Sequence, residues 1–113
     1  MRLKLLSPGE MNESQRQTYD ESIAGKRGKP PAPMMAWLNS PEMARRRNHV
    51  THYLRYETTF PKNIQELAII TTARAMDCPY VWNAHAPAAR QAGVSDALID
   101  ALRERRPLPA MSP

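Results

Sequence analysis

The feature that most constrains this chain is a run of three helix-forming segments between Phe60 and Arg106. The first segment, from Pro61 to about Met76, opens on a proline. Proline suits the first turn of a helix, because its missing N–H has no helical partner there. The centre of the segment, residues 67–70, is apolar on every side. An apolar surface all the way round predicts a buried helix.

One carboxylate, Glu66, interrupts this apolar helix. Helical spacing predicts that it shares a face with Ile70 and Ala73, and not with Lys62 and solvent. A carboxylate in such surroundings is either paired or has a raised pKa, because burial disfavours its charged form. If Glu66 is buried beside Ile70, we expect Glu66→Gln to leave stability nearly unchanged or to raise it, since a desolvated charge is removed. A loss above about 2 kcal/mol would instead indicate a paired structural carboxylate.

A break at residues 77–79 separates this helix from a second one. The second helix carries a stripe with spacings of four, three and four, formed by Cys78, Trp82, His85 and Ala89. Gly93 is placed to end the helix in the left-handed conformation that favours glycine. Ser95 is then the expected N-cap of a third helix, SDALIDALRER.

These residues carry a resemblance to a known family. Glu66, Cys78 twelve residues later, Tyr-Val-Trp, His85 and then AGVSDALIDAL resemble the carboxymuconolactone decarboxylase family, which includes the alkylhydroperoxidase D-like proteins. The resemblance covers about residues 60–106, and it continues more weakly in PGEMNESQRQTYDESIAGKRGK and SPEMARR. It implies an all-α domain of about five helices that forms an oligomer, because members of the family generally form trimers or hexamers.

The expected organisation is a single domain of this kind over residues 1–113. The expected parts are an arm at 1–10, a loop at 25–33, the core motif at 60–106 and a tail at 107–113. Family members usually carry further helices after the AGVSD helix, whereas this chain stops in RRPLPAMSP. We therefore expect either a truncated form or a core that is completed by oligomer contacts.

The sequence departs from the peroxidase members at one position. Those members carry two cysteines three residues apart, and the second lies four residues before the histidine. Here the first is Cys78, and Val81 stands in place of the second. Cys78 and His85 lie about 10 Å apart along a helix axis, at about 1.5 Å per residue, so only a residue between them can contact both. Peroxide reduction by a cysteine pair is therefore impossible, and the chain resembles the decarboxylase-type members more.

The leading functional expectation is a cofactor-independent reaction, either decarboxylation or lactone isomerisation, on a small carboxylated substrate. The resemblance supplies the substrate class, and the spacing of residues supplies only a possible acid–base pair. Glu66, with its pKa tuned upward, and His85 would move protons, since imidazole titrates near neutral pH. Tyr80 could donate a hydrogen bond, Arg47 could hold a carboxylate, and Trp82 would line the substrate pocket. A purely structural, hydrogen-bonded role for His85 is the alternative.

Two other functions stay open. Cys78 could act alone as a peroxide-reducing thiol in a peroxiredoxin-type antioxidant, helped by an external thiol. A position at a helix N-terminus favours a thiolate, although small buried cysteines are also common. The chain could also be a non-catalytic oligomerisation fragment. In that case, replacing Glu66 or His85 would leave folding unchanged and reveal no chemistry.

The segment from Pro41 to about Tyr56 is predicted to be a helix with Ser40 as its cap. Its apolar stripe consists of Met43, Val50 and Leu54. Arg47 lies on the stripe side by its spacing, where it could bind a substrate carboxylate or an interface acid; a snorkelling or solvated arginine is the alternative. The pair His49 and His52 has a spacing that can hold a metal, but no third ligand is evident, so no metal site is expected.

The N-terminal half is organised by local signals. A capping box at residues 12–15 opens a helix that runs to about Ala24, with Gly25 at its stop. Residues 25–33 form a basic loop rich in glycine and proline, which we interpret as a solvated linker. Residues 33–39, PMMAWLN, form a short apolar turn or helix, more typical of a core or a subunit interface than of a ligand cage.

Composition narrows the remaining classes. A single cysteine excludes an intramolecular disulfide. The first ten residues lack a long apolar run, so we expect no signal peptide, no membrane span and a cytoplasmic location. The net charge of +5 would attract anionic substrates or nucleic acid. The segment VWNAHAPAA carries almost no phosphate-binding or base-reading residues, so the expected partners are a small molecule and further copies of the chain, not nucleic acid.

Overall fold

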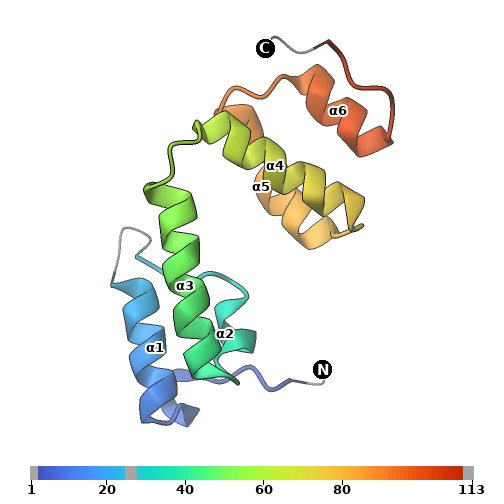
Figure 1. Cartoon of the computed structure of the whole chain (residues 1–113). Coiled ribbons are helices and arrows are strands. Elements are labelled where there is room, and N and C mark those ends of the chain that lie inside the picture. Colours follow the sequence, from blue (N-terminus) through green and yellow to red (C-terminus); the bar gives the residue numbers. More distant parts are fainter. Residues whose placement is uncertain (1–2, 25–27, 111–113) are drawn as a thin grey trace. The chain divides into compact units, whose positions relative to one another are not determined.

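The computed structural model describes residues 3–24 and 28–110, and all the regular structure in these residues is helical (Figure 1). Six α-helices and one 3-10 helix are present in this part of the chain. They are η1 (Pro8–Glu10), α1 (Glu13–Ile23), α2 (Met34–Trp37), α3 (Pro41–Tyr56), α4 (Lys62–Ala75), α5 (Pro79–Gln91) and α6 (Asp96–Glu104). The all-α prediction is confirmed, and α2 is the short apolar helix expected within residues 33–39.

The helices fall into two compact units, Met1–Thr58 and Thr59–Pro113. The first unit holds α1, α2 and α3, and the second holds α4, α5 and α6. The expectation of a single domain over the whole chain stays a prediction. Gly25, part of the 25–33 loop and the last residues of the tail lie outside the described residues.

In the first unit, α1 and α2 both pack against α3. The capping box of α1 is confirmed: the Asn12 side chain accepts a hydrogen bond from the Gln15 backbone N–H at 2.9 Å, and Gln15 Oε1 accepts one from the Asn12 N–H at 2.9 Å. The core is formed by Met34, Leu38 and Ala44, each fully buried. The interpretation of residues 33–39 as core is therefore confirmed for Met34 and Leu38.

The helix α3 has the predicted bounds, with two differences in detail. Ser40 occupies the N-cap position, but its side chain makes no capping hydrogen bond. The predicted apolar stripe is exposed, and Ala44 is the residue of α3 that is buried. A small side chain at the contact allows close packing, so the larger apolar side chains of α3 lie away from the core of this unit.

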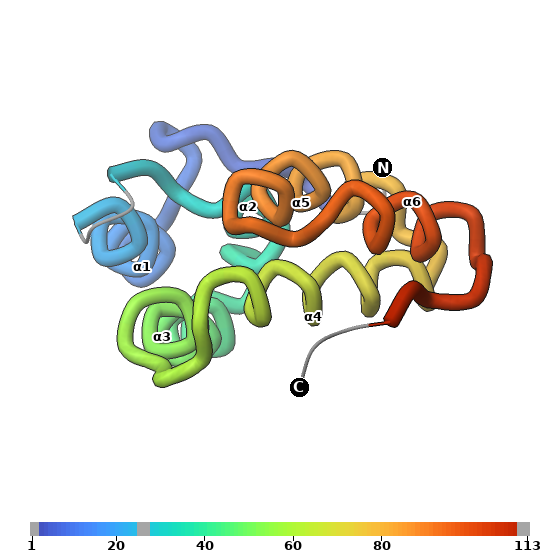
Figure 2. Tube along the Cα trace, turned by 90° about the horizontal axis from the view of Figure 1, so that it is seen from above, coloured from blue at the N-terminus to red at the C-terminus, as the bar shows by residue number. Residues whose placement is uncertain are grey.

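In the second unit, α4 and α5 pack side by side and α6 packs against both (Figures 1 and 2). The buried cluster combines small and branched side chains: Ile70, Ala86, Ala89, Val94, Leu98 and Ile99. Gly93 has a φ of 95°, which is the left-handed conformation expected for it. The Ser95 side chain accepts a hydrogen bond from the Leu98 backbone N–H at 3.3 Å, so the predicted cap of α6 is confirmed. Pro61 is the N-cap of α4 and not its first helical residue.

The described part of the arm holds the short helix η1. Before η1, the arm carries three leucines. Leu6 packs against the core of the first unit, whereas Leu3 and Leu5 are exposed. Within residues 3–24 and 28–110, every helix is too short or too polar to cross a lipid bilayer. The cytoplasmic location stays a prediction.

Candidate functional site

The central feature of the second unit is a buried contact between Glu66 of α4 and His85 of α5. The two atoms Glu66 Oε2 and His85 Nδ1 are 2.8 Å apart. The Glu66 side chain is 1% exposed, and that of His85 is 20% exposed. Glu66 shares its buried face with Ile70 and Ala73, as predicted. The packing of α4 on α5 thus joins two side chains that lie nineteen residues apart in the sequence.

Glu66 has a second partner on its own helix. Lys62 Nζ lies 3.1 Å from Glu66 Oε1, and the Lys62 side chain is 52% exposed. The prediction that Glu66 does not share a face with Lys62 is therefore wrong. Residues four apart on a helix are neighbours, and a long lysine side chain can reach a buried acceptor while much of it stays in water.

These contacts determine the charge of Glu66. Burial by itself raises the pKa of Glu66, but the hydrogen bonds from His85 and Lys62 outweigh burial, and they hold the pKa below its ordinary value of 4.5. The expectation of a pKa tuned upward is wrong for this reason. Of the two alternatives that the sequence leaves open, the paired carboxylate is the one observed.

The charge of Glu66 in turn fixes the orientation of His85. An ionised carboxylate only accepts hydrogen bonds, so the Nδ1–H of His85 is the donor. In the neutral imidazole the lone pair is then on Nε2. A histidine whose tautomer is set by a buried carboxylate can take a proton at Nε2 and give it back. The arrangement therefore suits proton transfer.

A pocket of about 540 Å³ lies elsewhere in the same unit. Eight residues from the end of α4, the start of α5 and α6 line it: Ala73, Arg74, Asp77, Cys78, Pro79, Trp82, Asn83 and Arg103. Sequence reasoning predicted roles for Cys78 and Trp82, and both line this pocket. It missed the charged and polar members, Arg74, Asp77, Asn83 and Arg103. The only sequence signal for them was their position at the ends of predicted helices.

The predicted site residues thus fall into separate places. Glu66 and His85 form one pair, and Cys78 and Trp82 line the pocket, whose lining includes neither member of the pair. The side chain of Tyr80 is 63% exposed and is not among the lining residues. The catalytic and binding roles of these residues stay predictions.

Arg47 belongs to the first unit. Its guanidinium carbon lies 3.5 Å from the centre of the Trp37 ring, and its Nη1 donates to Thr51 Oγ1 at 3.1 Å. Stacking on an aromatic face is a typical environment for arginine. Its proposed role in holding a substrate carboxylate stays a prediction.

One member of the histidine pair of α3, His52, lies beside a carboxylate and an aromatic ring. His52 Nδ1 lies 3.1 Å from Glu57 Oε1, and the imidazole is 5.0 Å from the Tyr56 ring, centre to centre. In the part of the chain that the structure describes, no group of three or more His, Cys, Asp or Glu side chains is placed to hold a metal ion.

Comparison with known families decides to which family the chain belongs. The family model described as "Carboxymuconolactone decarboxylase family" matches residues 41–111, which is more than half of the chain. The chain belongs to the carboxymuconolactone decarboxylase family. The match confirms the family that the Glu66, Cys78 and His85 spacing predicts, and it contains all six predicted site residues. No curated protein and no solved structure matches the chain.

Proposed function

We propose that the chain is an acid–base enzyme that decarboxylates or isomerises a small carboxylated, lactone-like substrate. The contact of 2.8 Å between Glu66 and His85 carries this proposal. The contact lies within the part of the chain that matches the carboxymuconolactone decarboxylase family. The Glu66–His85 pair can itself accept and donate a proton. The net charge of +5 favours the approach of an anionic substrate.

The roles of the two residues differ. Glu66 stays ionised near neutral pH, because its pKa is lowered, so it is a positioning residue that holds the His85 ring. His85 carries the proton. In an isomerisation, His85 Nε2 would take a proton from the carbon next to the carbonyl group and return it to another carbon of the conjugated system. In a decarboxylation, CO₂ leaves with its bonding electrons left on the substrate, and the imidazolium protonates that carbon.

The test is turnover of 4-carboxymuconolactone, followed by ultraviolet absorbance and CO₂ release. We expect His85→Ala to lower kcat by about 100-fold or more, because general acid–base catalysis typically contributes that factor. Glu66→Gln should lower kcat less and shift its pH profile, as befits a positioning residue. The matched control is His49→Ala, which removes an exposed histidine of α3. Full activity of His85→Ala, or no turnover by the unaltered chain, would contradict the proposal.

A lone-thiol peroxidase is the second candidate, favoured by the position of Cys78 in the lining of the pocket. Its thiolate would attack the peroxide O–O bond, giving a sulfenic acid and an alcohol, and an external dithiol would reduce the sulfenic acid with release of water. Peroxide consumption with excess dithiol, abolished by Cys78→Ser, would support this function. Lactone turnover that survives Cys78→Ser but not His85→Ala would support the first function.

A further inference from the structure

We propose that Lys62 is a further positioning residue of the site, and that it limits how readily His85 takes a second ring proton by sharing the charge of Glu66. Lys62 does not belong to the family spacing, which consists of Glu66, Cys78 and His85. The inference deepens the proposed function and rests on it, because the basicity of His85 matters for turnover only if His85 moves a proton.

The three side chains are joined through one carboxylate. Lys62 Nζ lies 3.1 Å from Glu66 Oε1, and His85 Nδ1 lies 2.8 Å from Glu66 Oε2. Burial raises the pKa of Glu66, whereas its hydrogen bonds with His85 and with Lys62 lower it, so the carboxylate is charged at neutral pH. Its single negative charge is therefore divided between two groups, one on each oxygen.

This division of charge acts on the proton of His85. While His85 is neutral, Lys62 and Glu66 form a pair without net charge. A second ring proton makes His85 a cation, and two cations then share one carboxylate. A nearby opposite charge favours the protonated imidazole, and a nearby like charge disfavours it. Lys62 therefore opposes the proton that Glu66 attracts, and the imidazolium gives that proton up more readily, as an acid–base catalyst must.

The position of Lys62 is unfavourable for α4 by itself. Lys62 is the first residue of α4, and the first turn of this helix holds no acidic residue. The positive end of the helix dipole lies at this turn and disfavours a cation. The contact with the buried carboxylate of Glu66 offsets this cost. The lysine is therefore accounted for by the site and not by the stability of the helix.

The other charged side chains of α4, α5 and α6 are paired among themselves. The pairs are Arg74 with Asp77, Arg90 with Asp96, and Arg103 with Asp100 and Glu104. None of these pairs includes Glu66 or His85. The remaining titratable groups of the α5 segment are the phenol of Tyr80, which is 63% exposed, and the thiol of Cys78, which lines the pocket. Lys62 is thus the cation that the contacts within this unit place on the Glu66–His85 pair.

The first experiment follows the ring nitrogens of His85 by ¹⁵N NMR as the pH is varied, without substrate. Lys62→Met keeps an unbranched side chain and removes the charge. We expect it to raise the pH midpoint of the His85 titration by about half a unit or more, the size set by a half-exposed charge. Glu66→Gln should lower the midpoint, because it removes the charge that favours the imidazolium. Lys62→Arg keeps the charge and should restore the midpoint of the unaltered chain.

The matched control is Arg106→Met, which removes a cation of the same unit that contacts Glu104 and not Glu66. It should move the midpoint much less, since it changes the net charge alone. Circular dichroism checks that the variants fold, and Lys62→Gln repeats the test with a polar side chain. An unchanged or lowered midpoint in Lys62→Met and Lys62→Gln, or an equal rise in Arg106→Met, would overturn the proposal.

The second experiment measures the pH dependence of 4-carboxymuconolactone turnover. The limb of the profile that His85→Ala abolishes should move to higher pH in Lys62→Met, in step with the NMR midpoint, and Lys62→Arg should restore it. A limb that stays in place in Lys62→Met would contradict the positioning role. The NMR midpoint needs no substrate, so a chain that turns over no lactone counts against the proposed function, whereas a midpoint that does not respond to Lys62 counts against this inference.

Discussion

At the scale of single residues, Glu66 shows how a charge is kept inside an apolar helix. Its side chain is 1% exposed, yet its contacts with His85 and Lys62 keep it ionised. One partner, His85, comes from the neighbouring helix, and the other, Lys62, lies one turn earlier on the same helix. Burying a carboxylate costs free energy unless it is paired and hydrogen-bonded, and here both of its oxygens have a partner.

This pairing changes the stability expected for Glu66→Gln. The variant should lower the free energy of unfolding at pH 7 by about 2 kcal/mol or more, because two charge-assisted hydrogen bonds of a buried group are replaced by weaker neutral ones. The lowered pKa means that ionised Glu66 stabilises the fold above its ordinary pKa of 4.5, and that this stabilisation is lost as the pH falls through the folded-state pKa. The difference between the two chains should therefore shrink below about pH 4.5. Urea unfolding across this pH range checks it.

The matched control is Glu42→Gln, which alters an exposed carboxylate that contacts Arg45 and Arg46 on α3. Exposed ion pairs contribute little, so we expect a smaller change at pH 7. A Glu66→Gln variant as stable as the unaltered chain at pH 7 would contradict the paired arrangement.

The burial of Glu66 was predictable from the sequence, but its contact with His85 was not. Its place among apolar residues indicated burial, and its shared spacing with Ile70 and Ala73 is confirmed. The contact with Lys62 was readable in principle, since the two residues are four apart. The contact with His85 depends on how α4 packs on α5, which helical spacing alone does not determine.

At the scale of elements, local capping signals predicted the ends of the helices to within one or two residues. Proline, serine and glycine act on the backbone beside them, so their effects follow from sequence. The pocket was not predictable in the same way. Arg74 and Arg103 lie twenty-nine residues apart and meet only because α6 folds back on the end of α4.

Two serines at helix starts give a matched pair of variants. Ser95→Ala should lower the free energy of unfolding by about 1 kcal/mol, because it removes the hydrogen bond to the Leu98 N–H. Ser40→Ala should have a much smaller effect, because the Ser40 side chain makes no capping hydrogen bond. Thermal or urea unfolding measures both. Equal losses in the two variants would contradict the assignment of these caps.

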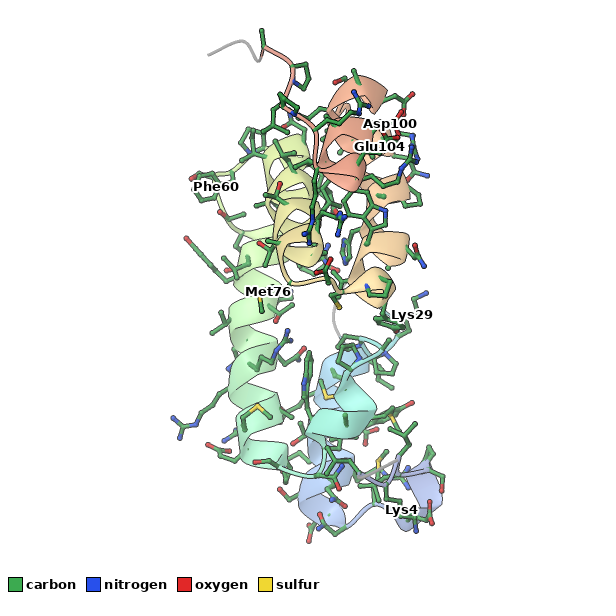
Figure 3. The ribbon with its side chains drawn as sticks, turned by 90° about the vertical axis from the view of Figure 1, so that its right-hand side faces the viewer. Lys4, Lys29, Phe60, Met76, Asp100 and Glu104 are labelled. Atoms are coloured by element: carbon green, nitrogen blue, oxygen red, sulfur yellow. The ribbon has the colours of Figure 1, made fainter. Side chains whose placement is uncertain are left out.

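At the scale of the whole molecule, large apolar side chains stay exposed on the described surface. In the second unit, Phe60 and Met76 flank α4 (Figure 3) and are 63% and 74% exposed. Between them, the outer face of α4 carries an uncharged exposed stripe at spacings of four, three and four, formed by Ile64, Ala68, Thr71 and Ala75. A contiguous uncharged face is typical of a protein contact.

We therefore propose that the chain forms a homo-oligomer through the outer face of α4. Light scattering behind a sizing column should give three or six times the chain mass of 12.8 kDa. Ala68→Glu should lower the mass, because it places a charge in the middle of the stripe. The matched control is Ala97→Glu, the same change at an exposed position of α6. A monomeric chain, or the same loss of mass in both variants, would refute this interface.

The central claim is that an ionised Glu66 holds His85 with its proton on Nδ1. The most direct test is ¹⁵N NMR of the imidazole rings at about pH 8.5, where histidines are generally neutral. His85→Asn assigns its signals among the three histidines. The account predicts that His85 carries its proton on Nδ1 and that its Nε2 has the shift of an unprotonated nitrogen. A proton on Nε2, with Nδ1 unprotonated, would contradict the Glu66–His85 pair and the acid–base role proposed for it.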